Sequence, residues 1–119
     1  MHYVDGFVLP VPSANLEQYR EMAELAGKVW KEHGALQFVE CVADDVKPGK
    51  VTSFPQAVQL KDGETVVFSF IVFESRAQRD AVNEKVMADP RLKDMMDPST
   101  LPFDGMRMFW GGFETIVEA

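Results

Sequence analysis

Two charged residues stand inside otherwise apolar stretches of this 119-residue chain. Asp5 follows "MHYV", and Arg107 stands within "MRMFW". A charge in such a stretch must reach water, find a partner or bind something. We expect the first and last of these stretches to form neighbouring strands, which predicts an ion pair between Asp5 and Arg107. The alternative is that Arg107 holds an acidic ligand, with apolar walls from Tyr3, Phe109 and Trp110.

His33 and Cys41 are further candidates for chemistry. His33 lies in the last turn of a predicted helix, just before Gly34, where the helix dipole stabilises positive charge. The alternative is that His33 acts as a base or ligand at the mouth of a pocket. Cys41 alternates with its neighbours along a predicted strand, and we expect it to be a small buried apolar residue. A nucleophilic Cys41 would need a base within hydrogen-bond distance.

Several possible metal-binding side chains follow one another closely. Glu40, Asp44 and Asp45 come within about a dozen residues of His33, and carboxylate and imidazole groups are ligands for divalent metals. Their spacing matches no established motif, so we expect no metal and interpret the carboxylates as solvated groups at the end of a strand. The sequence also lacks a Gly-x-Ser-x-Gly elbow and a phosphate-binding glycine-rich loop. We expect no cofactor.

Composition limits the class of protein. Lys and Arg total 12 against 19 Asp and Glu, a net charge of -7, which would repel a phosphate backbone, so we expect no nucleic-acid partner. The start of the chain has neither a basic segment nor a sustained apolar stretch, and we expect no signal peptide and no membrane anchor. One cysteine excludes an intrachain disulfide and fits a reducing cytoplasm. The length fits a single domain over residues 1–119.

The residue pattern predicts four strands and two helices in the order β-α-β-β-α-β, which places two helices against one antiparallel sheet. Strands show β-branched and aromatic residues, whereas the first helix shows apolar residues at three- and four-residue steps. The strands are expected at 2–11, 35–44, 66–73 and 106–117, and the helices at 16–33 and 75–89.

Short motifs predict where the helices begin. Ser13 or Asn15 can cap the first helix, and Ser75 with Gln78 forms a capping box for the second. A further short helical turn is expected to run through Met96.

The segment between the second and third strands carries two signals. Asp62-Gly63 suits a type I′ turn, which predicts that 66–73 is one arm of a β-hairpin. Before it, the loop 45–56 contains Phe54 and is long for a connection between two strands. Such a loop either folds over a site or is mobile.

The run "VVFSFIVF" at 66–73 carries apolar side chains on both faces of an extended strand. Two helices cover only one face of the sheet, and leaving the other face in water would forfeit about 1.5–3 kcal/mol per large apolar side chain. We therefore expect a second copy of the chain to pack its sheet face to face around a two-fold axis, forming a homodimer. The alternative is that the loop 45–56 and the C-terminus fold back over this face.

Four stretches, "EHGALQFVECVADDV", "TSFPQAVQLKDGETVVFSF", "SRAQRDAVNEKVM" and "PFDGMRMFWGGFE", closely resemble the YbaA-like bacterial family of unknown function. The resemblance implies an α+β, ferredoxin-like fold, with two helices on one face of an antiparallel sheet, that pairs into a dimeric α/β barrel. That superfamily includes cofactor-independent monooxygenases, haem-degrading enzymes, chlorite dismutase-like proteins and ligand-sensing modules. The haem-degrading branch depends on a histidine in the second helix, and residues 75–89 contain none.

Pattern and resemblance together predict a cytoplasmic homodimer that binds a small organic molecule in an apolar cavity, as an enzyme of the cofactor-independent oxygenase or isomerase type. The alternative is a non-catalytic dimeric binding or accessory module that interacts with another protein. The loop 45–56 distinguishes the two, because closure over a polar-lined cavity favours a ligand and a projecting apolar patch favours a partner. The candidate pocket residues carry aromatic, ionisable or thiol side chains: Tyr3, Asp5, His33, Cys41, Phe54, Arg107 and Trp110.

Overall fold

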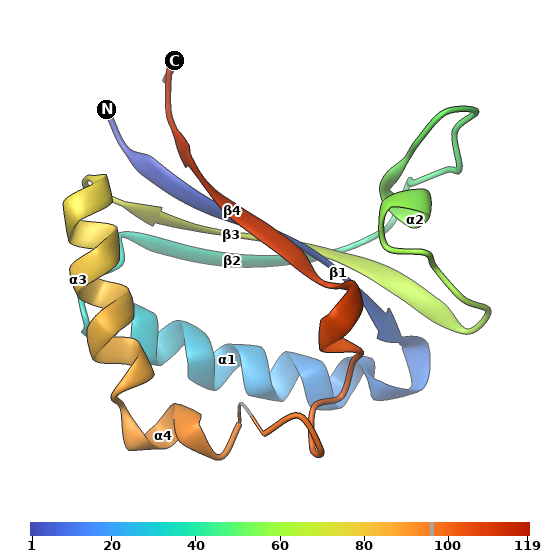
Figure 1. The fold of residues 1–119 in the computed structure, drawn as a ribbon, viewed down its shortest axis with the longest axis horizontal. Helices are drawn as coiled ribbons and strands as arrows, with labels where there is room; N and C mark the ends of the chain where they lie inside the picture. Colours follow the sequence, from blue (N-terminus) through green and yellow to red (C-terminus); the bar gives the residue numbers. More distant parts are fainter. Residues whose placement is uncertain (96) are drawn as a thin grey trace.

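The described part of the chain contains four strands and four α-helices, whose arrangement is drawn in Figure 1. The computed structural model describes residues 1–95 and 97–119. The strands are β1 (Tyr3–Pro12), β2 (Gln37–Val42), β3 (Glu64–Phe73) and β4 (Phe109–Glu114). The helices are α1 (Leu16–Glu32), α2 (Phe54–Ala57), α3 (Arg76–Met87) and α4 (Pro90–Lys93), with short 3-10 helices η1 (Ser13–Asn15) and η2 (Gly105–Arg107). The expected turn through Met96 is present as α4, and Met96 itself lies outside the described residues.

The strands form one sheet in the order β2-β3-β1-β4, and every neighbouring pair is antiparallel. The strands β2 and β4 are therefore its outer strands. The helices α1, α3 and α4 lie on one side of this sheet, whereas α2 lies on the other (Figure 1). The α+β class and the β-α-β-β-α-β order predicted from the sequence are confirmed.

The core lies between the sheet and the helices α1 and α3. Alternate residues of a strand point to the same face, so every second residue of β1 and β3 faces the helices. Tyr19 and Ala23 of the predicted apolar stripe are buried on α1, together with Val29. No helix in the described part of the chain combines the length and the apolar character needed to cross a membrane. The buried residues on the sheet side of this core are Tyr3, Leu9, Val11, Val67, Ile71 and Phe73.

The predicted hairpin before β3 is wrong. Residues 54–57 form α2, because Ser53 caps its start and Pro55 occupies the first turn, where a missing N–H costs nothing. Of the Asp62-Gly63 pair only Gly63 has a positive φ, of 81°. A type I′ turn requires a positive φ at both of its central residues. The strand β3 therefore follows a turn that leads out of a helical segment.

The face of the sheet opposite α1 and α3, here called the far face, is covered at one end by the segment that contains α2. Val58 is fully buried there and packs with Val8 of β1 and Val66 of β3. The ring of Phe54 meets the ring of Phe68 edge to face, with centroids 6.1 Å apart. The loop thus covers part of the face and leaves the rest open.

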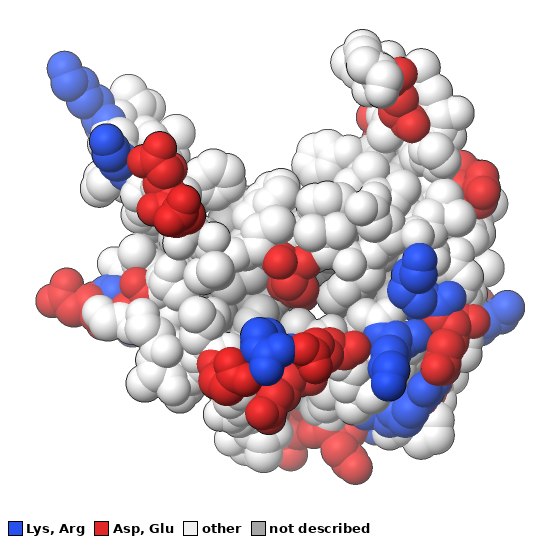
Figure 2. Space-filling view, turned by 180° about the vertical axis from the view of Figure 1, so that it is seen from behind, with Lys and Arg blue, Asp and Glu red and all other residues white. Residues whose placement is uncertain are grey.

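The uncovered part of the far face is apolar. Phe68, Phe109 and Phe113 are 41%, 47% and 63% exposed, and the strand register places all three on this face. Figure 2 shows it as an uncharged hollow between two projecting arms. One arm carries α2, and the other holds both chain ends, which leave the sheet side by side (Figure 1). The C-terminus does not fold back over the sheet. The alternative that the loop 45–56 and the C-terminus cover the far face is therefore correct only for the loop, which covers one end of that face.

Candidate functional site

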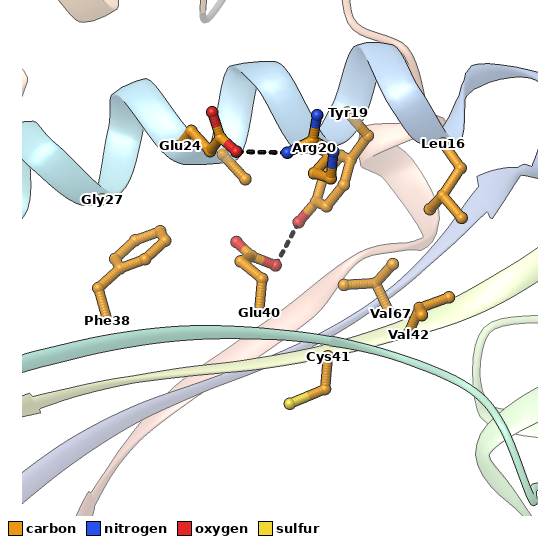
Figure 3. Close-up of a pocket in the computed structure, with 11 residues that line it drawn as sticks. Leu16, Tyr19, Arg20, Glu24, Gly27, Phe38, Glu40, Cys41, Val42 and Val67 are labelled. Carbon is orange, nitrogen blue, oxygen red and sulfur yellow. Dashed lines mark hydrogen bonds and ion pairs between the residues drawn. The ribbon is translucent and has the colours of Figure 1, made fainter.

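A cavity of about 410 Å³ opens between α1 and the outer strand β2 (Figure 3). Small residues on the sheet-facing side of α1 make room for it. A Cβ atom on Gly27 would lie 2.9 Å from Cδ1 of Phe38, so glycine at this position lets the Phe38 ring lie against the helix. The walls of the cavity are mainly apolar and come from Leu16, Ala23, Phe38, Val42 and Val67.

Glu40 and Tyr19 form the polar centre of the cavity. The Tyr19 hydroxyl donates a hydrogen bond of 2.7 Å to Oε2 of Glu40, and the two side chains meet in the space between α1 and β2 (Figure 3). Burial raises the pKa of Glu40, while hydrogen bonds from Tyr19 and Ser69 act in the opposite direction. Burial and the nearby Glu40 also raise the pKa of Tyr19. The phenol therefore stays protonated and remains a donor to the carboxylate.

Arg20 is the positively charged residue among the described side chains that line the cavity. Its guanidinium lies at the exposed rim, where Nε donates to Oε2 of Glu17 at 3.1 Å and Nη1 pairs with Glu24. The hydrogen bonds from Arg20 lower the pKa of Glu17. The positive charge of Arg20 is thus already matched by carboxylates of its own helix.

Replacing Glu40 with glutamine should change how stability depends on pH. The folded-state pKa of Glu40 is raised, so the native state holds this proton more tightly than the unfolded chain does. Its contribution to stability is present below the unfolded pKa and declines as pH rises towards the folded pKa. Glu40→Gln removes this decline. The free energy of unfolding of the variant, relative to the natural chain, should therefore increase in urea titrations as the pH rises from below the usual pKa of a glutamate towards the raised pKa of Glu40.

Glu21→Gln is the matched control for this measurement. Glu21 lies on the same helix-rich side of the molecule, is exposed and loses the same formal charge. Its stability profile should run parallel to that of the natural chain over the same pH range. A Glu40→Gln profile that also ran parallel would contradict the raised pKa.

Asp5 pairs with Arg79, so the predicted ion pair with Arg107 is wrong. Asp5 is 1% exposed, and its Oδ1 accepts a hydrogen bond of 2.8 Å from Nη1 of Arg79. Nδ2 of Asn83 lies 3.5 Å from Oδ2. The register places Gly112 of β4 opposite Asp5, whereas Arg107 precedes β4 in η2, beyond the paired part of that strand. Burial raises the pKa of Asp5, and the charge of Arg79 opposes that rise.

The Asp5–Arg79 pair belongs to a wider group of polar contacts, here called the Asp5 network. Nε1 of Trp30 donates to Oδ1 of Asn83 at 3.0 Å. The guanidinium of Arg79 lies 5.0 Å from the centroid of the Tyr3 ring, within the range of a cation–π contact. These five residues, Tyr3, Asp5, Trp30, Arg79 and Asn83, connect β1, α1 and α3.

Arg107 is held by carboxylates of its own chain. Its Nη1 and Nη2 donate to the two carboxylate oxygens of Glu64 at 2.8 and 2.6 Å, and its Nε donates to Asp104 at 2.9 Å. Hydrogen bonds from Arg107 lower the pKa of Glu64. The aromatic walls expected around an acidic ligand are also separated, since Phe109 lies on the far face and Trp110 on the helix-facing side.

The remaining candidates lie in different parts of the molecule. Nε2 of His33 is 2.9 Å from Oδ2 of Asp89 at the end of α1. Cys41 borders the cavity, but its side chain points away from it (Figure 3). Cys41 is exposed, so the expectation that it is buried is wrong, although its predicted alternation with Glu40 is confirmed. Phe54 lies over the far face. The seven residues expected to line one pocket therefore do not share one.

The four side chains considered as metal ligands are not grouped either. Glu40 bonds to Tyr19 inside the cavity, while His33 bonds to Asp89 at the end of α1. Across residues 1–95 and 97–119, no group of three or more His, Cys, Asp and Glu side chains is arranged to hold a metal ion.

The pairing of Tyr19 with Glu40 was missed from the sequence. Two signals could have found it. Tyr19 stands in the apolar stripe of its helix, so its hydroxyl is carried towards the sheet. Glu40 alternates with Cys41 and shares its strand face with Phe38 and Val42, which places a carboxyl group on the same side as the helix.

Comparison with known proteins gives both a family and a fold. The model of a family described as a protein of unknown function, DUF1428, matches residues 2–105. Uncharacterized proteins YbaA of Escherichia coli K12 and of Shigella flexneri are each 52% identical over 118 residues, covering 99% of both chains. The solved structure of a dimeric ferredoxin-like protein from an uncultured marine organism aligns over 100% of both chains, with a TM-score of 0.64 and 14% identity. The de novo designed protein Foldit4 aligns over 97% of this chain and 99% of its own length, with a TM-score of 0.51 and 11% identity.

Proposed function

The chain belongs to the DUF1428 family and has the ferredoxin-like fold, and on this premise we propose that it is a homodimer that binds a small organic molecule in the α1–β2 cavity of each protomer. In the same cavity, Glu40 would move a proton from one carbon of the bound molecule to another. No cofactor enters this proposal.

The observation that carries the proposal is the carboxyl group of Glu40 inside an apolar cavity. Ligand sites typically combine apolar walls, a volume of about 300–1,000 Å³ and a few convergent polar groups. The α1–β2 cavity has all three features. A carboxyl group in such a place costs stability, and titratable groups perturbed by burial cluster at functional sites.

The chemistry that suits this arrangement is isomerisation through an enol. The Glu40 carboxylate would take a proton from the carbon next to a carbonyl group of the ligand, leaving an enolate and a neutral carboxylic acid. The same acid would return the proton to another carbon of the conjugated system, which restores the carboxylate. Tyr19 would hold the carboxylate in place through its hydrogen bond. A proton carrier at the cavity centre favours this isomerase form over an oxygenase, because the isomerisation needs no oxidant.

The homodimer would form through the far face. The three exposed phenylalanines on this face, Phe68, Phe109 and Phe113, would leave water on dimerisation, and the hollow between the two arms offers room for a second sheet (Figure 2). A relative with the same fold is described as dimeric, which supports the proposal. The free thiol of Cys41 agrees with a place in the reducing cytoplasm.

Val42→Trp should abolish ligand binding without disturbing the core. Val42 lines the cavity and is 50% exposed, so an indole at this position would occupy the cavity from its edge. In a thermal-shift screen of phenols and enolisable carbonyl compounds, a ligand at a hundred times its Kd should stabilise the natural chain by about 2.7 kcal/mol. The variant should lose that stabilisation.

Leu25→Trp is the matched control, because Leu25 lies on α1 outside the cavity lining and is 37% exposed. It should respond to the same compounds as the natural chain does. Compounds that stabilise the Val42→Trp variant and the natural chain equally would bind elsewhere and would argue against the cavity. The alternative of a non-catalytic accessory module predicts no stabilising compound and a stable complex with another protein.

A further inference from the structure

We infer that the α1–β2 cavity takes a ligand with a short apolar body and one primary ammonium group, and that the ammonium group binds Glu40. The inference rests on the ligand-binding part of the proposed function, since it names the ligand class of the same cavity. It assigns Glu40 as the group that binds the ligand and does not depend on the proton transfer. Its basis is the balance of charge around Glu40.

Glu40 lacks a positively charged partner among the described residues that line the cavity. Tyr19 and Ser69 offer it neutral hydroxyl donors, whereas a buried carboxylate is best stabilised by an opposite charge. A carboxylate has about four acceptor positions, so these two hydroxyl groups leave room for another donor. A positively charged ligand would supply the counter-charge for Glu40 that the residues lining the cavity do not provide.

The buried carboxylate of Asp5 provides a comparison for the partly buried Glu40. Asp5 is also set among apolar residues, and there the protein supplies the cation itself, with Nη1 of Arg79 at 2.8 Å. Both carboxylates belong to strands and face the helices. The difference is that Asp5 is 1% exposed, whereas Glu40 stands at an open cavity that a ligand can enter.

The rim of the cavity disfavours an acidic ligand. Arg20 is the cation nearest the opening, and its guanidinium is occupied by Glu17 and Glu24. With Glu40 these side chains make three carboxyl groups against one guanidinium. In a chain whose net charge is -7, the local field attracts cations and repels anions.

The apolar walls define the rest of the ligand. Phe38 and Leu16 stand on either side of the polar centre (Figure 3), and Val67 lies on the sheet between them. A volume of about 410 Å³ suits a molecule with one ring and a short chain. An ammonium group close to the Phe38 ring would also gain a cation–π contact.

Three compounds that share a ring and a chain, and differ only in the end group, test this inference. Phenethylamine, phenethyl alcohol and phenylacetate should be titrated into the natural chain by calorimetry at neutral pH. The amine should bind at least about tenfold more tightly than the alcohol, because a charge-assisted hydrogen bond is worth more than a neutral one. Phenylacetate should bind most weakly.

Glu40→Gln should abolish the preference for the amine and leave the affinity for the alcohol within about threefold of its original value. Glu21→Gln removes the same formal charge from an exposed site on α1 outside the cavity lining, and it should retain the preference. The pair of variants separates a contact with Glu40 from a general effect of surface charge.

The outcomes separate this inference from the proposed function. Equal or tighter binding of the alcohol by the natural chain would overturn the ammonium ligand and leave the cavity as a binding site. An amine preference that persists in Glu40→Gln would also overturn it, because the ammonium group would then bind elsewhere. If none of the three compounds binds, the ligand class fails, and the proposed function is judged by the phenols and enolisable carbonyl compounds of the thermal-shift screen. Binding that survives in Val42→Trp would place the ligand outside the cavity and would count against both.

Discussion

Replacing Arg79 with methionine is expected to lower the free energy of unfolding by about 3–5 kcal/mol. The variant would leave the buried carboxyl group of Asp5 without its guanidinium, because Arg79 is the cation bonded to Asp5. The Asp5 side chain is 1% exposed and that of Arg79 is 12% exposed. Asn83 alone lies at 3.5 Å from the carboxylate and cannot replace the lost charge. Urea unfolding at neutral pH and one fixed protein concentration measures the loss.

The loss should depend on pH in a defined direction. Without Arg79, whose charge lowers the pKa of Asp5 in the natural chain, that pKa should rise further. The variant should therefore recover part of its stability as the pH falls and Asp5 becomes protonated. Arg76→Met is the matched control, because Arg76 is exposed on the same helix and its loss should cost less than about 0.5 kcal/mol. A change of under about 1 kcal/mol in Arg79→Met would show that Asp5 is not held by this pair.

Phe68→Asp should convert the proposed homodimer into a monomer. Phe68 lies on β3, on the exposed part of the far face, where a second sheet would surround the new carboxylate with apolar side chains. Burying an unpaired charge in an interface costs several kcal/mol, so the dissociation constant should rise by at least about a hundredfold. Sedimentation equilibrium at micromolar concentrations measures the change.

Leu25→Asp is the control for this substitution, because Leu25 is an exposed leucine of α1 on the other side of the sheet. It should remain a dimer. Cys41 offers a second measurement, since its exposed thiol lies on the same face as Phe68. Alkylation of Cys41 should become slower as the concentration of the natural chain rises, and should not do so in Phe68→Asp. A natural chain that sediments as a monomer at micromolar concentration would refute the dimer.

Hydrophobic periodicity was enough to predict the order of the elements and the helix-facing core. The three- and four-residue steps around Tyr19 identified α1, and the two-sided run at 66–73 identified the central strand β3. Both signals are local, because each depends on the spacing of residues within one element. The capping box at Ser75 was equally local, and Ser75 does accept the hydrogen bond from the backbone N–H of Gln78.

The hairpin prediction failed because a turn signal was given more weight than a helix signal. Asp62-Gly63 is a frequent hairpin sequence, but "SFPQ" at 53–56 follows the same Ser-x-x-Gln pattern that starts α3, with a proline in the first turn. Ser53 accepts a hydrogen bond from the backbone N–H of Gln56 at 3.3 Å. Giving both capping boxes the same weight would have predicted α2.

The site depended on pairings that no local pattern specifies. Either of two arginines could have paired with Asp5, and strand register decided which one does. The register places Gly112 opposite Asp5, and Arg79 of α3 reaches the carboxylate from the helix side of the sheet. Tyr19 and Glu40 come from different elements and meet only because α1 crosses over β2. Side-chain direction on each element was predictable, but the distance between elements was not.

The Asp5 network and the cavity have no residue in common, but they are in contact, because the ring centroids of Trp30 and Phe38 lie 5.8 Å apart. The network connects β1 to α1 and α3, whereas the cavity is lined by β2, by Val67 of β3 and by α1 from Leu16 to Gly27. Substitutions at residues in contact are usually not additive in their effect on stability. Phe38 therefore links the chamber to the scaffold, and a change of its ring would be transmitted through Trp30 to the buried ion pair.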